Sequence, residues 1–162
     1  METQERGVTH RAAGEGRAFW ILGEMLVEFK ATGAETGGAY SAFELTTQPE
    51  GGPPPHKHRD DEGFYVLEGR FEFPLGEGTV EAGPGSFVHI PGGTVHTFRC
   101  VGTAPGRLLV TASPAGPHER FFAEIGEPAT DRTSPPAHEG PPDVEGLVTA
   151  AARHGIEILP PS

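Results

Sequence analysis

The abundance of glycine and proline limits what this chain can fold into more than any other feature. The 162 residues include 24 glycines and 17 prolines, about a quarter of the sequence, and both residue types interrupt long helices and strands. The apolar residues form short runs between them, such as SFVHIP (residues 86–91) and RLLVTASP (residues 107–114). Short runs separated by turn residues every 8–12 or so positions are typical of a β-sandwich or small β-barrel. We therefore expect an all-β core.

Other segments fit the same pattern. The remaining strand candidates are residues 19–29 (one or two strands), 40–47, 63–73 (a strand pair or a bent strand), a short strand within 74–85, and 95–101. Gly69 suits a tight turn inside residues 63–73. We expect three parts: a polar tail (1–17), a β domain (18–115) and a C-terminal helical extension (116–162).

Two helices are expected in this extension. In residues 118–127 Phe121, Phe122 and Ile125 share a face, and in residues 143–154 Val144, Leu147, Val148 and Ala151 repeat at helical spacing. A Pro-rich linker (127–143) separates them. We expect both helices to pack against the outside of the β domain rather than to close the mouth of a barrel.

Composition excludes several functions. The chain has 12 basic and 23 acidic side chains, for a net charge of −11, which repels nucleic acid. No apolar run approaches the roughly 18 residues of a membrane span, and residues 1–17 lack the apolar core of a signal peptide. Because Cys100 is the one cysteine, no intrachain disulfide can form. We expect a cytoplasmic protein without nucleic-acid or membrane partners.

The segment HKHRDDE (residues 56–62) contains three of the four candidate metal ligands. In an extended strand, residues two apart share a face, so His56 and His58 point the same way. Glu62 follows after three residues, which allows a turn that returns its carboxylate to that side. His96 can join them from a distant strand if the sheet closes on itself. Three imidazoles and one carboxylate would leave open positions on a metal.

The other histidines give weaker evidence of a functional role. His10 and His138 lie in polar segments, and His118 and His154 flank the expected helices, where a histidine often meets the helix dipole. We interpret His89 as an exposed strand residue.

At HKHRDDE the sequence resembles the cupin superfamily, whose first motif ends in H-x-H-x(3,4)-E-x(6)-G. His56, His58, Glu62 and Gly69 fit with every gap correct. The leading glycine of that motif falls at Glu50, one residue before Gly51.

The second cupin motif, G-x(5)-P-x-G-x(2)-H-x(3)-N, matches Gly85, Pro91, Gly93 and His96, with Cys100 in place of the final Asn. Cys100 is not at a ligand position, and we interpret it as a small buried hydrophobe. Phe98 shares a face with His96, so we expect it to line a cavity, with Phe43, Phe64 and Tyr65 as further wall candidates.

The resemblance implies a double-stranded β-helix (a jelly roll, or cupin barrel) with one or two short C-terminal helices. It implies a divalent transition metal (Fe, Ni, Co, Mn, Cu or Zn) held by His56, His58, Glu62 and His96. The chain looks like cupins described as quercetin dioxygenase-like, which implies an oxidoreductase that oxygenates an enolisable aromatic small molecule, with Glu62 as catalytic base. A non-oxidative metal-dependent cyclase or isomerase, and a binding cupin without turnover, are the alternatives. We also expect a homodimer, because sheet edges need covering.

Overall fold

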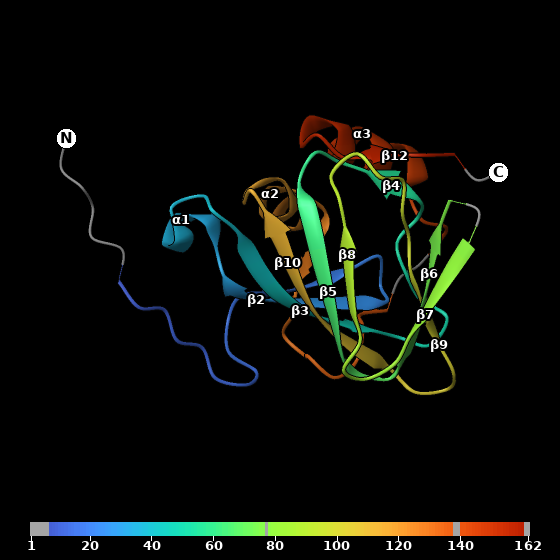
Figure 1. The fold of residues 1–162 in the computed structure, drawn as a ribbon, viewed down its shortest axis with the longest axis horizontal. Helices are drawn as coiled ribbons and strands as arrows, with labels where there is room; N and C mark the ends of the chain where they lie inside the picture. Colours follow the sequence, from blue (N-terminus) through green and yellow to red (C-terminus); the bar gives the residue numbers. More distant parts are fainter. Residues whose placement is uncertain (1–6, 77, 138–139, 161–162) are drawn as a thin grey trace.

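The computed structural model describes residues 7–76, 78–137 and 140–160, and these form a mostly β architecture with antiparallel sheets and short helices (Figure 1). The largest sheet has the strand order β11-β1-β2-β3-β10-β5-β8. Its strands are β1 (Ala18–Ile21), β2 (Met25–Ala31), β3 (Ser41–Thr47), β5 (Asp61–Glu68), β8 (Phe87–Ile90), β10 (Gly106–Ser113) and β11 (Glu127–Pro128). The all-β core expected from the sequence is thus confirmed.

A second sheet packs against the first and closes the core between them. It has the order β7-β6-β9, with β6 (Arg70–Leu75), β7 (Gly78–Ala82) and β9 (Arg99–Val101). Phe64 of β5 contacts Phe73 of β6, with ring centroids 5.3 Å apart. Cys100 is fully buried in this core, which confirms its interpretation as a small hydrophobe, and burial raises the pKa of its thiol.

Strand boundaries follow the turn residues. Residues 63–73 contain parts of β5 and β6 joined at Gly69, whose φ of 81° is a left-handed conformation. The strand expected over residues 95–101 is shorter than predicted. Only Arg99–Val101 forms β9, while His96 makes an isolated bridge with His56.

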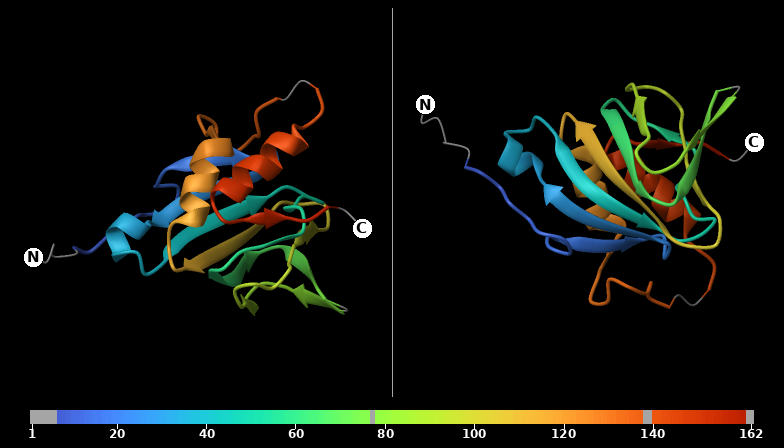
Figure 2. Two further views of the ribbon diagram at one scale, coloured as in Figure 1. Left: turned by 90° about the horizontal axis from the view of Figure 1, so that it is seen from above. Right: turned by 60° about the horizontal axis from the view of Figure 1, so that its bottom comes forward.

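Three helices occur in the described residues: α1 (Gly33–Thr36), α2 (Pro117–Ile125) and α3 (Val144–Arg153). The expected second helix begins after Asp143, whose side chain accepts a hydrogen bond from the Gly146 backbone (2.9 Å). Figure 2 shows α2 and α3 side by side over one end of the sheets. No helix in the described part of the chain has the length and apolar character needed to cross a membrane.

The C-terminal segment is tied to the β core by a small third sheet. It consists of β4 (His56–Lys57) and β12 (Glu157–Ile158), in which Ile158 pairs with His56. The linker before α3 is also held, because the Trp20 indole donates a hydrogen bond to the Asp131 carbonyl (2.8 Å). The C-terminal segment therefore packs directly on the strand that carries His56.

Candidate metal centre

Backbone pairing places His56 and His96 next to each other. His56 lies in β4, and its N–H and C=O exchange hydrogen bonds of 3.0 and 2.9 Å with the backbone of His96. This antiparallel bridge brings the two imidazole centroids to 4.3 Å. His58 follows two residues later, and its ring centroid lies 5.4 Å from that of His56. The predicted same-face arrangement of the HxH pair is present.

A glycine turn holds the His58 segment close to the His96 segment. The Gly93 N–H donates to the His58 carbonyl (2.7 Å), and the Gly92 N–H donates to the Asp61 carboxylate (2.6 Å). A Cβ at Gly92 would lie 1.9 Å from the carbonyl oxygen of Arg59. The Pro-Gly-Gly turn is therefore required for this close approach.

Glu62 comes from β5, the strand next to the β8 edge of the large sheet. It lies on β5, paired with Ala112 of β10 on one side and Ile90 of β8 on the other. Its Oε1 lies 2.5 Å from His58 Nε2 and 3.0 Å from His96 Nε2. One ligand atom from each of His56, His58, Glu62 and His96 falls within 4.8 Å of all the others. The four predicted residues therefore converge on one point.

The hydrogen bonds of the three rings decide which nitrogens face that point. The Nδ1 atoms lie next to backbone carbonyl oxygens: His56 with Pro54 (2.9 Å), His58 with Asp60 (3.1 Å) and His96 with Thr94 (2.8 Å). A carbonyl only accepts, so each Nδ1 must carry the proton. In the neutral rings, Nε2 then presents a lone pair.

This arrangement fits a cation. His58 Nε2 is buried and, although Glu62 Oε1 is near, the two atoms are not aligned for a hydrogen bond. Lone pairs on three nitrogens and a carboxylate oxygen repel one another unless a proton or a metal ion lies among them. Three imidazoles and one carboxylate are donors that first-row transition metals accept. His56, His58, Glu62 and His96 are thus the residues that would hold the metal.

A fourth imidazole, His118, lies beside these residues. It belongs to the first turn of α2 and is buried, so the interpretation that it only flanks the helix and meets the helix dipole is wrong. Its Nε2 lies 3.6 Å from Glu62 Oε1 and its Nδ1 lies 3.0 Å from Asp60 Oδ2. Neither His118 nor Asp60 was predicted from the sequence to belong to the site. His138 lies outside the described residues.

Known proteins resemble this chain in sequence and in fold. The profile of the Cupin domain family matches residues 43–112, the segment that holds all four converging residues. This chain contains a cupin domain. It is 28% identical over 148 residues to the quercetin 2,3-dioxygenase of Bacillus subtilis (strain 168), a match that covers 91% of this chain and 43% of that protein. The cupin described here thus spans less than half the length of that relative.

Solved structures share the fold. KdgF from a Halomonas species superimposes with a TM-score of 0.59 at 18% identity, over 67% of this cupin and 96% of KdgF. An RmlC-like cupin from Shewanella frigidimarina gives a TM-score of 0.58 at 20% identity, over 68% of this cupin and 96% of that chain. At such low identity these matches establish the architecture alone.

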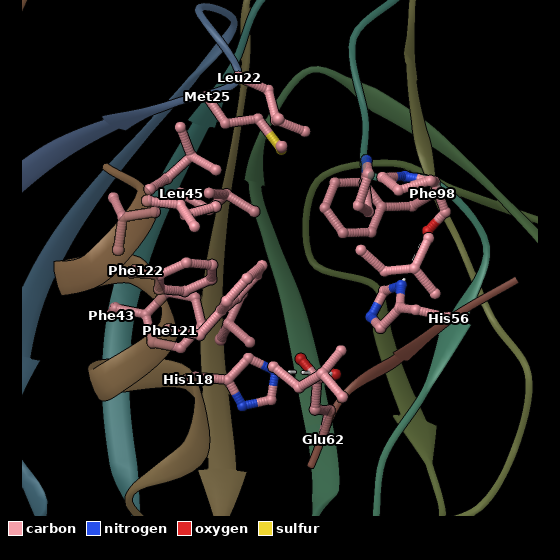
Figure 3. A pocket seen from close by; sticks show the side chains of 18 of the residues that line it. Leu22, Met25, Phe43, Leu45, His56, Glu62, Phe98, His118, Phe121 and Phe122 are labelled. Atoms are coloured by element: carbon pink, nitrogen blue, oxygen red, sulfur yellow. Dashed lines mark hydrogen bonds and ion pairs between the residues drawn. The ribbon is translucent and has the colours of Figure 1, made fainter. Parts of the chain in front are cut away.

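An apolar cavity opens beside the converging residues (Figure 3). It has a volume of about 690 Å³, including its open mouth. Among the predicted wall residues, Phe43, Phe64 and Phe98 line it. Tyr65 does not: it is 41% exposed and pairs with Phe87 on the outer face of the sheet, because successive strand residues face opposite ways. His89 is exposed, as predicted.

The C-terminal helices form part of the cavity wall. Phe121, Phe122 and Ile125 of α2 line the cavity, together with Leu147 of α3 and Ile158 of β12. The expectation that these helices only cover the outside of the β domain is therefore wrong. Since they close one side of the cavity, they help to decide what can enter it.

Burial and charge shift the proton affinities of the cluster. Burial, helped by nearby His96, lowers the pKa of His56 to about 4. Burial opposes the charged form of His58 as well, but Asp60 and Glu62 overcome it and raise its pKa to about 9. In the same way, Glu62 and Asp60 overcome burial and raise the pKa of His118 to about 10. Metal binding at His58 must therefore displace a proton.

The two carboxylates respond in the opposite sense. Burial opposes ionisation of Glu62, but the adjacent His118, His58 and His96 hold its pKa well below the ordinary value. His118 and His58 likewise lower the pKa of Asp60 against the effect of burial. Both carboxyl groups are thus ionised at neutral pH and available to a cation.

Proposed function

We propose that this cupin is a metal-dependent oxygenase that acts on an enolisable aromatic small molecule. One observation carries the proposal: a cluster of three histidines and one glutamate adjoins a cavity with an almost entirely apolar wall. The distant relative named quercetin 2,3-dioxygenase supports the choice of reaction.

The cavity favours a neutral, flat ligand. Its wall contains several phenylalanines and no lysine or arginine among the described residues, and Glu62 is its one acidic residue. A sugar acid or a phosphate would meet mainly apolar side chains in this wall, which make no hydrogen bonds to it, whereas a flat aromatic ring would pack on the phenylalanines.

Each residue then has a role. His56, His58, Glu62 and His96 would hold the metal, which supplies a Lewis acid for a substrate oxygen and a redox partner for dioxygen. The contacts of Glu62 with His58, His96 and His118 all involve Oε1. The second carboxylate oxygen is then free to accept the proton of a substrate hydroxyl. Phe64 and Phe98 would orient an aromatic ring and exclude water. Both atoms of dioxygen enter the product, so no external reductant is required.

The test uses metal-stripped protein reloaded separately with each of iron, cobalt, nickel, manganese, copper and zinc. Quercetin is the probe, and an oxygen electrode measures dioxygen uptake. We expect uptake equal to quercetin consumed with at least one redox-active metal, none with zinc, and loss of activity in Glu62→Gln. The matched control is Glu81→Gln, on the exposed strand β7.

Other outcomes would replace the proposal. Turnover of quercetin under argon would indicate non-oxidative chemistry at the same site. Metal binding without turnover of quercetin or other enolisable aromatic compounds would indicate a binding protein.

A further inference from the structure

Asp60 links one of the four converging residues to the C-terminal helix α2. Its Oδ1 lies 3.1 Å from His58 Nδ1, and its Oδ2 lies 3.0 Å from His118 Nδ1. Asp60 is 2% exposed, so both contacts are shielded from bulk water. Its carboxylate lies at ion-pair distance from two imidazoles that come from distant parts of the chain, although neither contact is aligned for a hydrogen bond.

His118 contacts two of the four residues. Its ring packs edge-on against the His58 ring, with centroids 4.7 Å apart and planes at 83°. Its Nε2 lies 3.6 Å from Glu62 Oε1. Figure 3 shows the His118 ring extending from α2 toward Glu62. Movement of His118 would thus disturb both His58 and Glu62.

The position of His118 depends in turn on how α2 is held against the β core. Glu119, the next residue, accepts hydrogen bonds from the Gly33 N–H and the Ser41 hydroxyl, both 2.6 Å long. Behind His118, Phe122 packs on Phe43 with centroids 5.6 Å apart. These contacts hold the start of α2 against the β core.

A purely structural role explains this arrangement poorly. The Asp60 backbone carbonyl accepts the His58 Nδ1 proton, and its carboxylate lies at the same distance from that nitrogen, so Asp60 holds this ring from two sides. A buried ion pair also contributes little net stability, because desolvation offsets the attraction. The carboxylate and His118 nevertheless lie against the residues that would hold the metal, where partners of ligating histidines tune metal binding.

We propose that His118 and Asp60 are positioning residues of the metal centre, through which α2 sets the orientation of His58 and Glu62. The inference rests on the proposed metal binding but not on the identity of the substrate. It makes α2 part of the centre as well as part of the cavity wall.

Cobalt(II) alone tests this inference. Its visible absorption spectrum reports ligand geometry, and titration gives its dissociation constant. His118→Phe keeps a ring of similar shape and removes both nitrogens. We expect it to weaken cobalt binding about 10- to 100-fold and to change the spectrum. His118→Asn, whose amide can still reach Asp60, should recover part of the affinity. The control is His154→Phe, because His154 caps α3 and contacts Glu124 instead.

A second variant covers the case in which His118→Phe does not fold because Asp60 is left as an unpaired buried charge. Asp60→Asn combined with His118→Phe removes both charges at nearly constant volume. We expect it to fold, by circular dichroism, and to bind cobalt as weakly as His118→Phe. Wild-type affinity and spectrum in the double variant would overturn the inference while leaving the metal centre intact. Failure of the wild-type protein to bind cobalt would overturn the metal centre itself, and this inference with it.

Discussion

Replacing Gly92 by alanine should damage the metal centre without touching a ligand. The new Cβ would lie 1.9 Å from the Arg59 carbonyl oxygen, whereas real Cβ contacts stay beyond 3.0 Å. The Pro-Gly-Gly turn and the segment after His58 must therefore move apart by about 1 Å. Ligand distances in metal sites tolerate about 0.2 Å, so His58 cannot keep its place relative to Glu62.

Two measurements check this expectation. We expect Gly92→Ala to bind cobalt about 100-fold more weakly, as for a disturbed ligand set, and to lose about 1–3 kcal/mol of unfolding free energy, as for other overpacked sites. Urea denaturation gives the second quantity. Gly83→Ala is the control, because a Cβ at Gly83 meets nothing within 4 Å. If Gly92→Ala matched Gly83→Ala in both measurements, the reasoning from close approach would be refuted.

Three further predictions concern the centre and the surface. Elemental analysis should show that His58→Ala has lost most of the bound metal. The control variant His89→Ala, which changes an exposed histidine, should keep it. Equal metal contents in the two variants would exclude His58 as a ligand. Metal-free protein should lose stability from about pH 6.5 to about pH 10, because the raised pKa values of His58 (about 9) and His118 (about 10) make the native state bind more protons than the unfolded state. Urea midpoints that stay flat or rise over this range would contradict the prediction. We predict a homodimer through the edge strand β8, where Phe87 is 63% exposed, so light scattering should show a dimer that Phe87→Glu converts to a monomer.

Much of this architecture could be predicted because turn residues mark the strand ends. Glycine and proline separate the apolar runs, and the structure follows these breaks at Gly69 and at the Pro-Gly-Gly turn. The position of the leading glycine in the first cupin motif shows that the backbone conformation can persist when the residue changes. Glu50 occupies it and still adopts φ of 66°, so the chain retains the left-handed conformation without the residue that favours it.

The convergence of His56, His58, Glu62 and His96 was predictable from spacing and family resemblance, but Asp60 and His118 were missed. Two simple signals were available. Asp60 lies between His58 and Glu62, in the turn that was expected to return the Glu62 carboxylate to the side of the histidines, and residues 59–60 form a bend there. His118 precedes Phe121 and Phe122 by three and four residues, which places it on the buried face of the helix.

The short strands and the placement of the C-terminal helices leave no signal in the local sequence. The strands β4, β11 and β12 contain two residues each, too few for any periodicity. Their pairing depends on contacts with distant segments. The role of α2 and α3 in the cavity wall was missed for the same reason, since an apolar helix face does not reveal which surface it covers.

The pairing of β12 with β4 has a consequence for biosynthesis. Lys57 and its partner Glu157 are one hundred positions apart, so the ribosome makes the histidine-bearing strand long before the strand that completes its sheet. A nascent chain can form most of the barrel while this edge remains unpaired. His56, His58, Glu62 and His96 are all made before β12, so the sheet around His56 is completed only after the four converging residues exist.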